Sequence, residues 1–127
     1  MYRQFLRKRE RIFHSITRRM KFRTVASMPN RSKPVLLVET KSVLNLYNTR
    51  GYNISSVHGD KEFQCIREEI RPMDLNIYAK YDHVPEVERS TRTVKERVRC
   101  TMHSLPFNRI PRLMCKRVVE KAVKNLN

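Results

Sequence analysis

Apolar and polar side chains alternate along several stretches of the chain. In RIFHSITRR (11–19) and MKFRTVASM (20–28) every second residue is apolar or nearly so, which is the period of a strand with one buried face. We predict two strands joined as a hairpin through Arg18, Arg19 and Lys21. DLNIYAK (74–80) alternates in the same way. YNISSVHG (52–59) is rich in β-branched and aromatic residues and ends at a glycine, so we predict strands in both segments.

Other segments repeat their apolar residues at helical spacing. Residues 34–49 predict a helix, and Gly51 lies where a left-handed C-terminal cap is expected. KEFQCIREEI (61–70) predicts a short helix. A long helix is predicted from Pro85, which suits a first helical position, and a last helix over residues 112–126. The residues expected on the inner faces of these four helices are Leu36, Val43, Leu46 and Tyr47; Phe63, Ile66 and Ile70; Val87, Val94, Val98, Met102 and Leu105; and Leu113, Val119, Ala122 and Leu126.

The predicted order is strand, strand, helix, strand, short helix, strand, long helix, helix. This order indicates an α/β fold in which helices cover a sheet. A length of 127 residues fits one domain with a hydrophobic core of its own.

The charge of the chain indicates a polyanionic partner. Its 28 Lys and Arg against 12 Asp and Glu give a formal net charge of +16, which attracts nucleic acid. Residues 60–99 hold nine cationic and nine acidic side chains, so the excess lies outside this window. One class that fits is a non-catalytic, basic RNA-binding structural protein, such as a mitochondrial ribosomal component. The Arg-rich start, which also suits a mitochondrial presequence, favours it, and the neutral window opposes it.

Cysteine and hydropathy patterns exclude other classes. Cys65, Cys100 and Cys115 are an odd number without a CxxC pair, so neither a disulfide framework nor a structural zinc site is indicated. No apolar run approaches the roughly 20 residues of a membrane span, and we expect no membrane partner.

Two carboxylates are candidates for catalysis and metal binding. Asp60 follows the strand that ends at Gly59, and Glu88 lies in the first turn of the long helix. If that helix packs beside the strand, the carboxylates converge and can bind Mg²⁺ for phosphoryl transfer. The simpler interpretation makes Asp60 a helix cap and Glu88 part of a solvated face. His58, two residues before Asp60, fits a structural role better than that of a base.

A row of cations follows Glu88 along the predicted helix. Steps of helical spacing lead to Arg92, Lys95 and Arg99, away from the apolar face. Such a row suits the phosphates of a nucleic acid strand, and Arg89, next to Glu88, is a fourth candidate DNA contact. The alternative is a set of i,i+4 ion pairs, each contributing only about 0.3 to 0.5 kcal/mol.

Three segments resemble a known family. LYNTRGYNISSVHGDKEFQCIREEI, HVPEVERSTRTVKERVR and HSLPFNRIPRLM are similar to the integrase catalytic core of copia-type retrotransposon polyproteins, and the likeness runs from about Phe13 to Asn127. The most specific parts are GDKEF and VERSTRTVKER. The resemblance implies a ribonuclease-H-like fold, a mixed central sheet flanked by helices.

The resemblance also implies a chemistry. Two Asp and one Glu of such a core bind two Mg²⁺ (or Mn²⁺), and the enzyme trims the ends of the element's DNA and joins them to chromosomal DNA in the nucleus. By motif, Asp60 is the second acid and Glu88 the third, while Arg92 and Lys95 take the places that contact the element's DNA end. Because integrases work as multimers, a homo-oligomer is a candidate state.

The chain departs from the family at its start. The first acid should be an Asp on an initial central strand, but no Asp precedes Asp60, and Glu10 and Glu39 are the earlier acids. We therefore expect a basic N-terminal extension (1–12) before a partial integrase core (13–127) that lacks its first strand. We expect it to bind DNA without catalysing strand transfer. Glu10 or a second chain is the alternative source of the first carboxylate.

Overall fold

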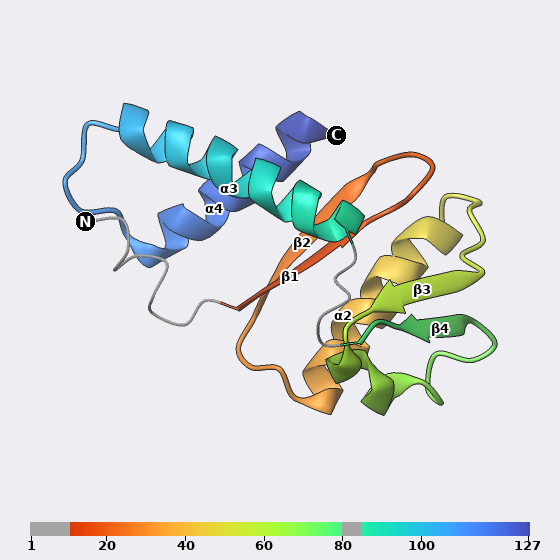
Figure 1. Cartoon of the computed structure of the whole chain (residues 1–127). Helices are drawn as coiled ribbons and strands as arrows, with labels where there is room; N and C mark the ends of the chain where they lie inside the picture. Colours follow the sequence, from red (N-terminus) through yellow and green to blue (C-terminus); the bar gives the residue numbers. More distant parts are fainter. Residues whose placement is uncertain (1–10, 80–84) are drawn as a thin grey trace. The chain divides into compact units, whose positions relative to one another are not determined.

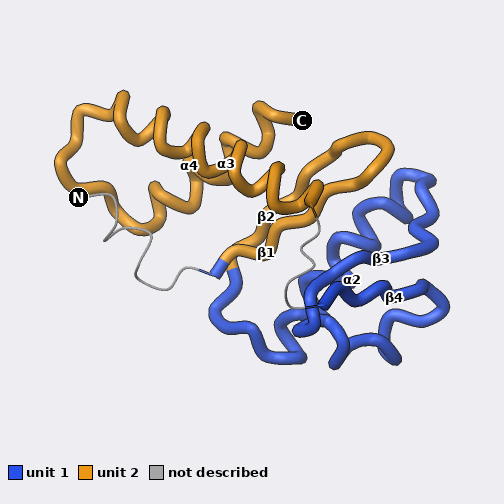
Figure 2. Tube along the Cα trace, viewed as in Figure 1, with its two compact units in different colours: residues 1–11, 28–84 blue, residues 12–27, 85–127 orange. Residues whose placement is uncertain are grey.

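The computed structural model describes residues 11–79 and 85–127. It separates into two compact units, shown in Figure 2. Unit 1 comprises Met1–Arg11 and Met28–Val84, and unit 2 comprises Ile12–Ser27 and Pro85–Asn127. Each unit is treated by itself below. The predicted division into residues 1–12 and 13–127 stays a prediction, because residues 1–10 lie outside the described part of the chain.

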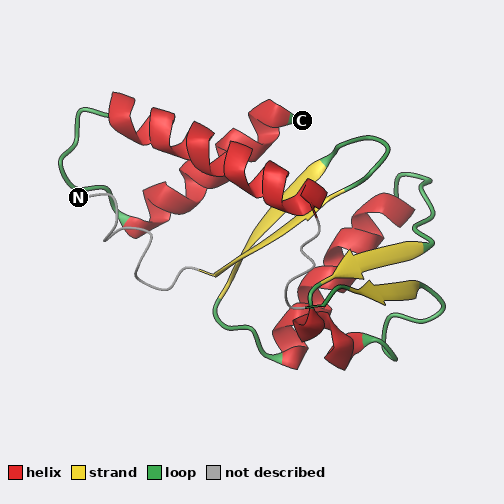
Figure 3. Cartoon of the chain, in the orientation of Figure 1, coloured by secondary structure: helices red, strands yellow, loops and turns green. Residues whose placement is uncertain are grey.

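The secondary structure follows the predicted order (Figures 1 and 3). The elements are β1 (Arg11–Ile16), β2 (Arg23–Met28), α2 (Lys33–Asn48), β3 (Ser56–Gly59), the 3₁₀-helix η1 (Lys61–Ile66), β4 (Asp74–Ile77), α3 (Pro85–Ser104) and α4 (Arg112–Leu126). This confirms an α/β chain with the expected succession of elements. None of the helices in the described residues combines the length and apolar character that a membrane span needs.

The described strands form two sheets of two strands each, β1 with β2 and β3 with β4. The single central sheet is therefore confirmed only in part. β3 and β4 run parallel, with Ser56 opposite Asp74 and Gly59 opposite Ile77. The predicted lack of a first strand stays a prediction, because residues 1–10 lie outside the described part of the chain.

The core of unit 1 lies between α2, η1 and the β3–β4 pair. Ile66 and Ile70 are 0% and 1% exposed, and Leu36, Leu44 and Leu75 are also buried. The predicted inner face of α2 is rotated slightly, because Thr40 and Leu44 are buried while Val43 and Leu46 are only half-buried. Gly51 has φ +82°, as its predicted capping position requires.

The core of unit 2 is built where α3 packs on α4. Its buried residues are Val94, Val98, Met102, Ile110, Val118, Ala122 and Val123, and Val25 of the hairpin packs against them. Of the predicted α3 stripe, Val94, Val98 and Met102 are buried, Leu105 packs against the core from just beyond the helix, and Val87 is only half-buried. Leu113 was predicted inward, which is wrong: it is 66% exposed. At about 100° per residue it falls roughly opposite the stripe that Val118, Ala122 and Val123 form on α4.

Each of the four predicted strands has one boundary that differs, and β2 begins at Arg23 rather than residue 20 while β4 ends at Ile77 rather than residue 80. The strand predicted over 52–59 begins only at Ser56, because Tyr52–Ser55 closes the end of α2: Tyr52 N–H donates to Tyr47 O at 3.0 Å. The first hairpin strand ends at Ile16 rather than residue 19, since Thr17 and Phe22 close the turn through backbone bonds.

Ile66→Ala tests the core of unit 1. Because Ile66 is fully buried, the change should lower the free energy of unfolding by about 2 to 5 kcal/mol. Val38→Ala, at a side chain 64% exposed on α2, should change it by less than about 0.5 kcal/mol. Urea denaturation measures both, and equal losses for the two variants would contradict this core.

Candidate functional site

Asp60 stands at the carboxyl end of β3, on a backbone that is fixed from both sides. Tyr78 N–H donates to Gly59 O at 3.0 Å, and Phe63 N–H donates to Asp60 O at 3.0 Å. A Cβ on Gly59 would lie 2.9 Å from the Phe63 ring, so the close approach of η1 to β3 needs a glycine here. Asp60 takes the N-cap position of η1, but its side chain is exposed and makes no capping hydrogen bond. The Asp60 carboxylate therefore does not cap η1.

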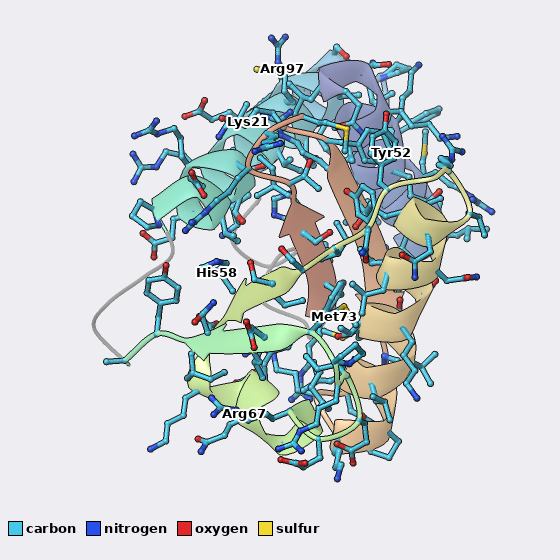
Figure 4. All side chains as sticks on the ribbon, turned by 90° about the vertical axis from the view of Figure 1, so that its right-hand side faces the viewer. Lys21, Tyr52, His58, Arg67, Met73 and Arg97 are labelled. Carbon is cyan, nitrogen blue, oxygen red and sulfur yellow. The ribbon has the colours of Figure 1, made fainter. Side chains whose placement is uncertain are left out.

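His58 lies on β3, two residues before Asp60. Its Nδ1 is 3.2 Å from the Tyr78 hydroxyl, and the two rings are tilted at 5.8 Å. Figure 4 shows His58 on β3. The bond to Tyr78, the residue after β4, supports the structural role predicted for this histidine.

Glu88 and its neighbour Glu86 have different surroundings in the first turn of α3. Arg18 Nε donates to Glu86 Oε2 at 3.0 Å, and Lys21 Nζ lies 3.7 Å from Glu86 Oε1. Glu86 therefore ties α3 to the hairpin turn, besides its favourable place at a helix N-terminus. Glu88 is exposed, whereas Glu86 is half-buried.

The four candidate DNA contacts on α3 are all exposed: Arg89, Arg92, Lys95 and Arg99. A second stripe of the helix, Ser90, Val94, Val98 and Met102, is buried. At 3.6 residues per turn, Glu88, Arg92, Lys95 and Arg99 stand within about 60° of one another around the helix axis. The predicted row beside Glu88 is thus a continuous exposed face of one helix.

A polar cluster holds the beginning of α3 to the hairpin, and the sequence did not predict it. His14 on β1 lies 3.0 Å from Thr91 Oγ1 through Nδ1 and 3.2 Å from Ser90 Oγ through Nε2. Arg23 on β2 donates from Nε to Ser90 Oγ at 2.9 Å. Ser90 is 3% exposed, so these bonds satisfy a buried hydroxyl.

His14 is held neutral in this cluster. Burial and the nearby Arg23 guanidinium lower its pKa from 6.5 to about 4. A serine beside a histidine can form a nucleophile and base, but an imidazole of so low a pKa is a weak base near pH 7. The cluster is therefore a structural clamp on α3.

The net charge is concentrated in unit 2. Its 59 residues, 12–27 and 85–127, hold 15 Lys or Arg and four Asp or Glu. The described residues of unit 1 from Met28 to Ala79 hold seven and six. The attraction to polyanions that the composition predicts thus belongs to the unit that carries the α3 row.

Asp60 belongs to unit 1 and Glu88 to unit 2, so their convergence on one metal ion stays a prediction. Within residues 11–79 and 85–127, no group of three or more His, Cys, Asp or Glu is arranged to hold a metal ion. Glu10 and His83 lie outside the described residues. Mg²⁺ often takes only one or two carboxylates and completes its shell with water and phosphates, and Asp60 and Glu88 have the right ligand type for it.

The structure is similar to a solved integrase core. It matches the catalytic core domain of BIV integrase with a TM-score of 0.65 and 13% sequence identity, over 91% of this chain and 74% of that chain. At the level of sequence, no protein-family model matches, and neither does any curated protein. The chain therefore has the fold of an integrase catalytic core. This supports the predicted ribonuclease-H-like architecture.

The His14 clamp predicts a dependence of stability on pH. The unfolded chain protonates His14 below about pH 6.5, whereas the folded chain does so only near pH 4. Stability from this group is full above pH 6.5 and falls as the pH drops toward 4. With allowance for its partial exposure, we expect a loss of about 1 to 2 kcal/mol.

Urea denaturation between pH 7 and pH 4.5 measures this loss. His14→Gln, which keeps hydrogen-bonding groups but does not titrate, should lose about 1 to 2 kcal/mol less than the native chain over that range. Parallel pH profiles for the two chains would show that His14 is not held neutral.

Proposed function

We propose that this chain is a DNA-binding integrase core of the copia-type retrotransposon class that acts in the nucleus and does not catalyse strand transfer by itself. The observation that carries the proposal is the exposed face of Glu88, Arg92, Lys95 and Arg99 on α3, in a chain whose fold is that of an integrase core. The segments that resemble copia-type cores contain this face.

The α3 row is well suited to phosphates. Its cations lie on a helix whose other face is fixed by apolar packing and by the His14 clamp, so little ordering is needed on binding. Neutralising phosphates with Lys and Arg releases counterions and gives salt-dependent affinity. The surplus of cations in unit 2 adds to this attraction. We infer that α3 lies along a DNA backbone.

Catalysis is proposed to be absent because the set of acids is incomplete. Residues 1–59 contain no Asp. Asp60 and Glu88 are therefore the two triad acids that the resemblance to integrase cores assigns. These two would hold Mg²⁺ or Mn²⁺, and such an ion would supply Lewis-acid stabilisation of a phosphoryl group. Two carboxylates without the third hold a metal less firmly.

Removal of the α3 row tests DNA binding. Arg92→Gln/Lys95→Gln/Arg99→Gln should lower the slope of log Kd against log salt concentration by about 2 to 3, since each phosphate contact contributes about 0.9. Fluorescence anisotropy of a labelled duplex with the sequence of an element end measures it.

The matched control is Lys41→Gln/Arg50→Gln/Lys61→Gln, which removes the same charge from exposed positions of unit 1. It should leave the slope nearly unchanged. Equal losses in the two triple variants would show that total charge and not α3 determines binding. Tighter binding of an RNA duplex than of DNA would favour the RNA-binding structural class instead.

The absence of catalysis is tested with the same DNA ends. The purified chain should leave an element-end duplex uncut in Mg²⁺ and in Mn²⁺, with denaturing gels as the readout. If it cuts the duplex and Asp60→Asn abolishes the cutting, the chain is a working enzyme and its first carboxylate comes from elsewhere. Asp74→Asn, at an exposed carboxylate on the neighbouring strand, controls for loss of charge.

A further inference from the structure

The connection between α3 and α4 presents an aromatic side chain to solvent. Phe107 is 54% exposed, although Ile110, three residues later, is only 9% exposed in the core of unit 2. Leu105, two residues before it, also packs against that core. Both sides of the connection are thus anchored, and Phe107 is held outward between them. Exposed apolar surface is unfavourable in water, so a surface that covers the Phe107 ring would bind favourably.

The surroundings of Phe107 are cationic. Arg109 and Arg112 are exposed within five residues of it, and residues 97–119 contain no Asp or Glu. Successive Cα atoms are about 3.8 Å apart, so the Arg109 side chain can reach a group that sits beside the ring. An exposed apolar ring followed within five residues by two exposed guanidinium groups is complementary to an apolar surface joined to anions, and a nucleic acid base with its flanking phosphates has that form.

We propose that Phe107 is a stacking platform for an unpaired base of single-stranded DNA, with Arg109 and Arg112 meeting the neighbouring phosphates. The choice of DNA as the ligand rests on the proposed function. The site itself is separate from the α3 row, because it lies in the connection beyond the C-terminal end of α3 (Figure 1).

The chemistry of Phe selects an unpaired base. A phenyl ring has no hydrogen-bonding group with which to read base edges in a groove, and the faces of paired bases are already stacked on their neighbours. Only an unstacked base offers its face, and stacking on an aromatic ring is then favourable whatever the base. A frayed or trimmed DNA end supplies such bases.

The absence of tryptophan from the chain provides a direct test. Phe107→Trp introduces a single fluorophore at the proposed site. Its emission should be quenched on addition of oligothymidylate and not on addition of a blunt duplex. Tyr52→Trp is the matched control, because Tyr52 is an aromatic residue 50% exposed in unit 1 (Figure 4). Equal quenching at positions 52 and 107 overturns the site.

Affinity gives a second readout. Phe107→Ala should weaken the binding of labelled oligothymidylate about fivefold or more, and Phe107→Leu, which keeps apolar bulk without a π face, should weaken it as well. Phe107→Tyr should restore it. The affinity for duplex DNA, which reports the α3 row, should stay unchanged in all three, so a failure of the proposed function is seen separately as a loss of duplex binding by the native chain.

Two results overturn the proposal. One is an unchanged affinity of Phe107→Ala for oligothymidylate while circular dichroism shows a folded chain. The other is tighter binding of oligouridylate than of oligothymidylate, which would assign the ring to RNA.

Discussion

The hydrogen bonds of the Arg23 guanidinium hold the elements of unit 2 together. Its Nε donates to Ser90 on α3, and its Nη1 donates to the carbonyl of Leu126 in the last turn of α4 at 3.2 Å. The backbone of the same residue exchanges two hydrogen bonds of 2.8 Å with the side chain of Asn127. Charge-assisted bonds contribute about 1.5 to 3 kcal/mol each, and a cation at the C-terminal end of a helix is favourable in itself. One side chain therefore joins β2, α3 and α4.

This arrangement constrains the chemistry around it. Burial, and after it the fixed cation of Arg23, lower the pKa of His14, so the ring stays neutral within the cluster. The N-terminal part of α3 is thus held by polar bonds through Ser90, and the following turns by apolar contacts of Val94 and Val98 with α4. Since the buried face holds the helix along its length, the backbone positions of the exposed cations are fixed too. Their mutual repulsion opposes folding and is relieved when a polyanion binds.

The sequence predicted those parts of the fold that depend on local spacing. The order of strands and helices, the α3 stripe and the left-handed Gly51 all follow from residues close together in the chain. Leu113 was placed inward because an apolar residue in an amphipathic helix is assumed to face the core, but the rotation of α4 is set by where α3 lies. Thr40 was missed for the opposite reason, because a polar residue in a buried stripe breaks the pattern. The bonds between His14 and Ser90 join residues 76 positions apart, and no periodicity indicates them.

The candidate site also has a part that local spacing predicts and a part that depends on packing. Motif and spacing placed Asp60 after β3 and Glu88 in the first turn of α3, and both positions are as predicted. The convergence of the two depends on packing between elements that no local pattern describes. Phe107 shows the complementary case: by hydropathy it belongs with Leu105 and Ile110, and only when those two fill the core does the ring between them become surface. The side chains that do not pack into the core form such a binding surface. The buried residues of α3 and α4 therefore determine both the cationic face and the exposed ring.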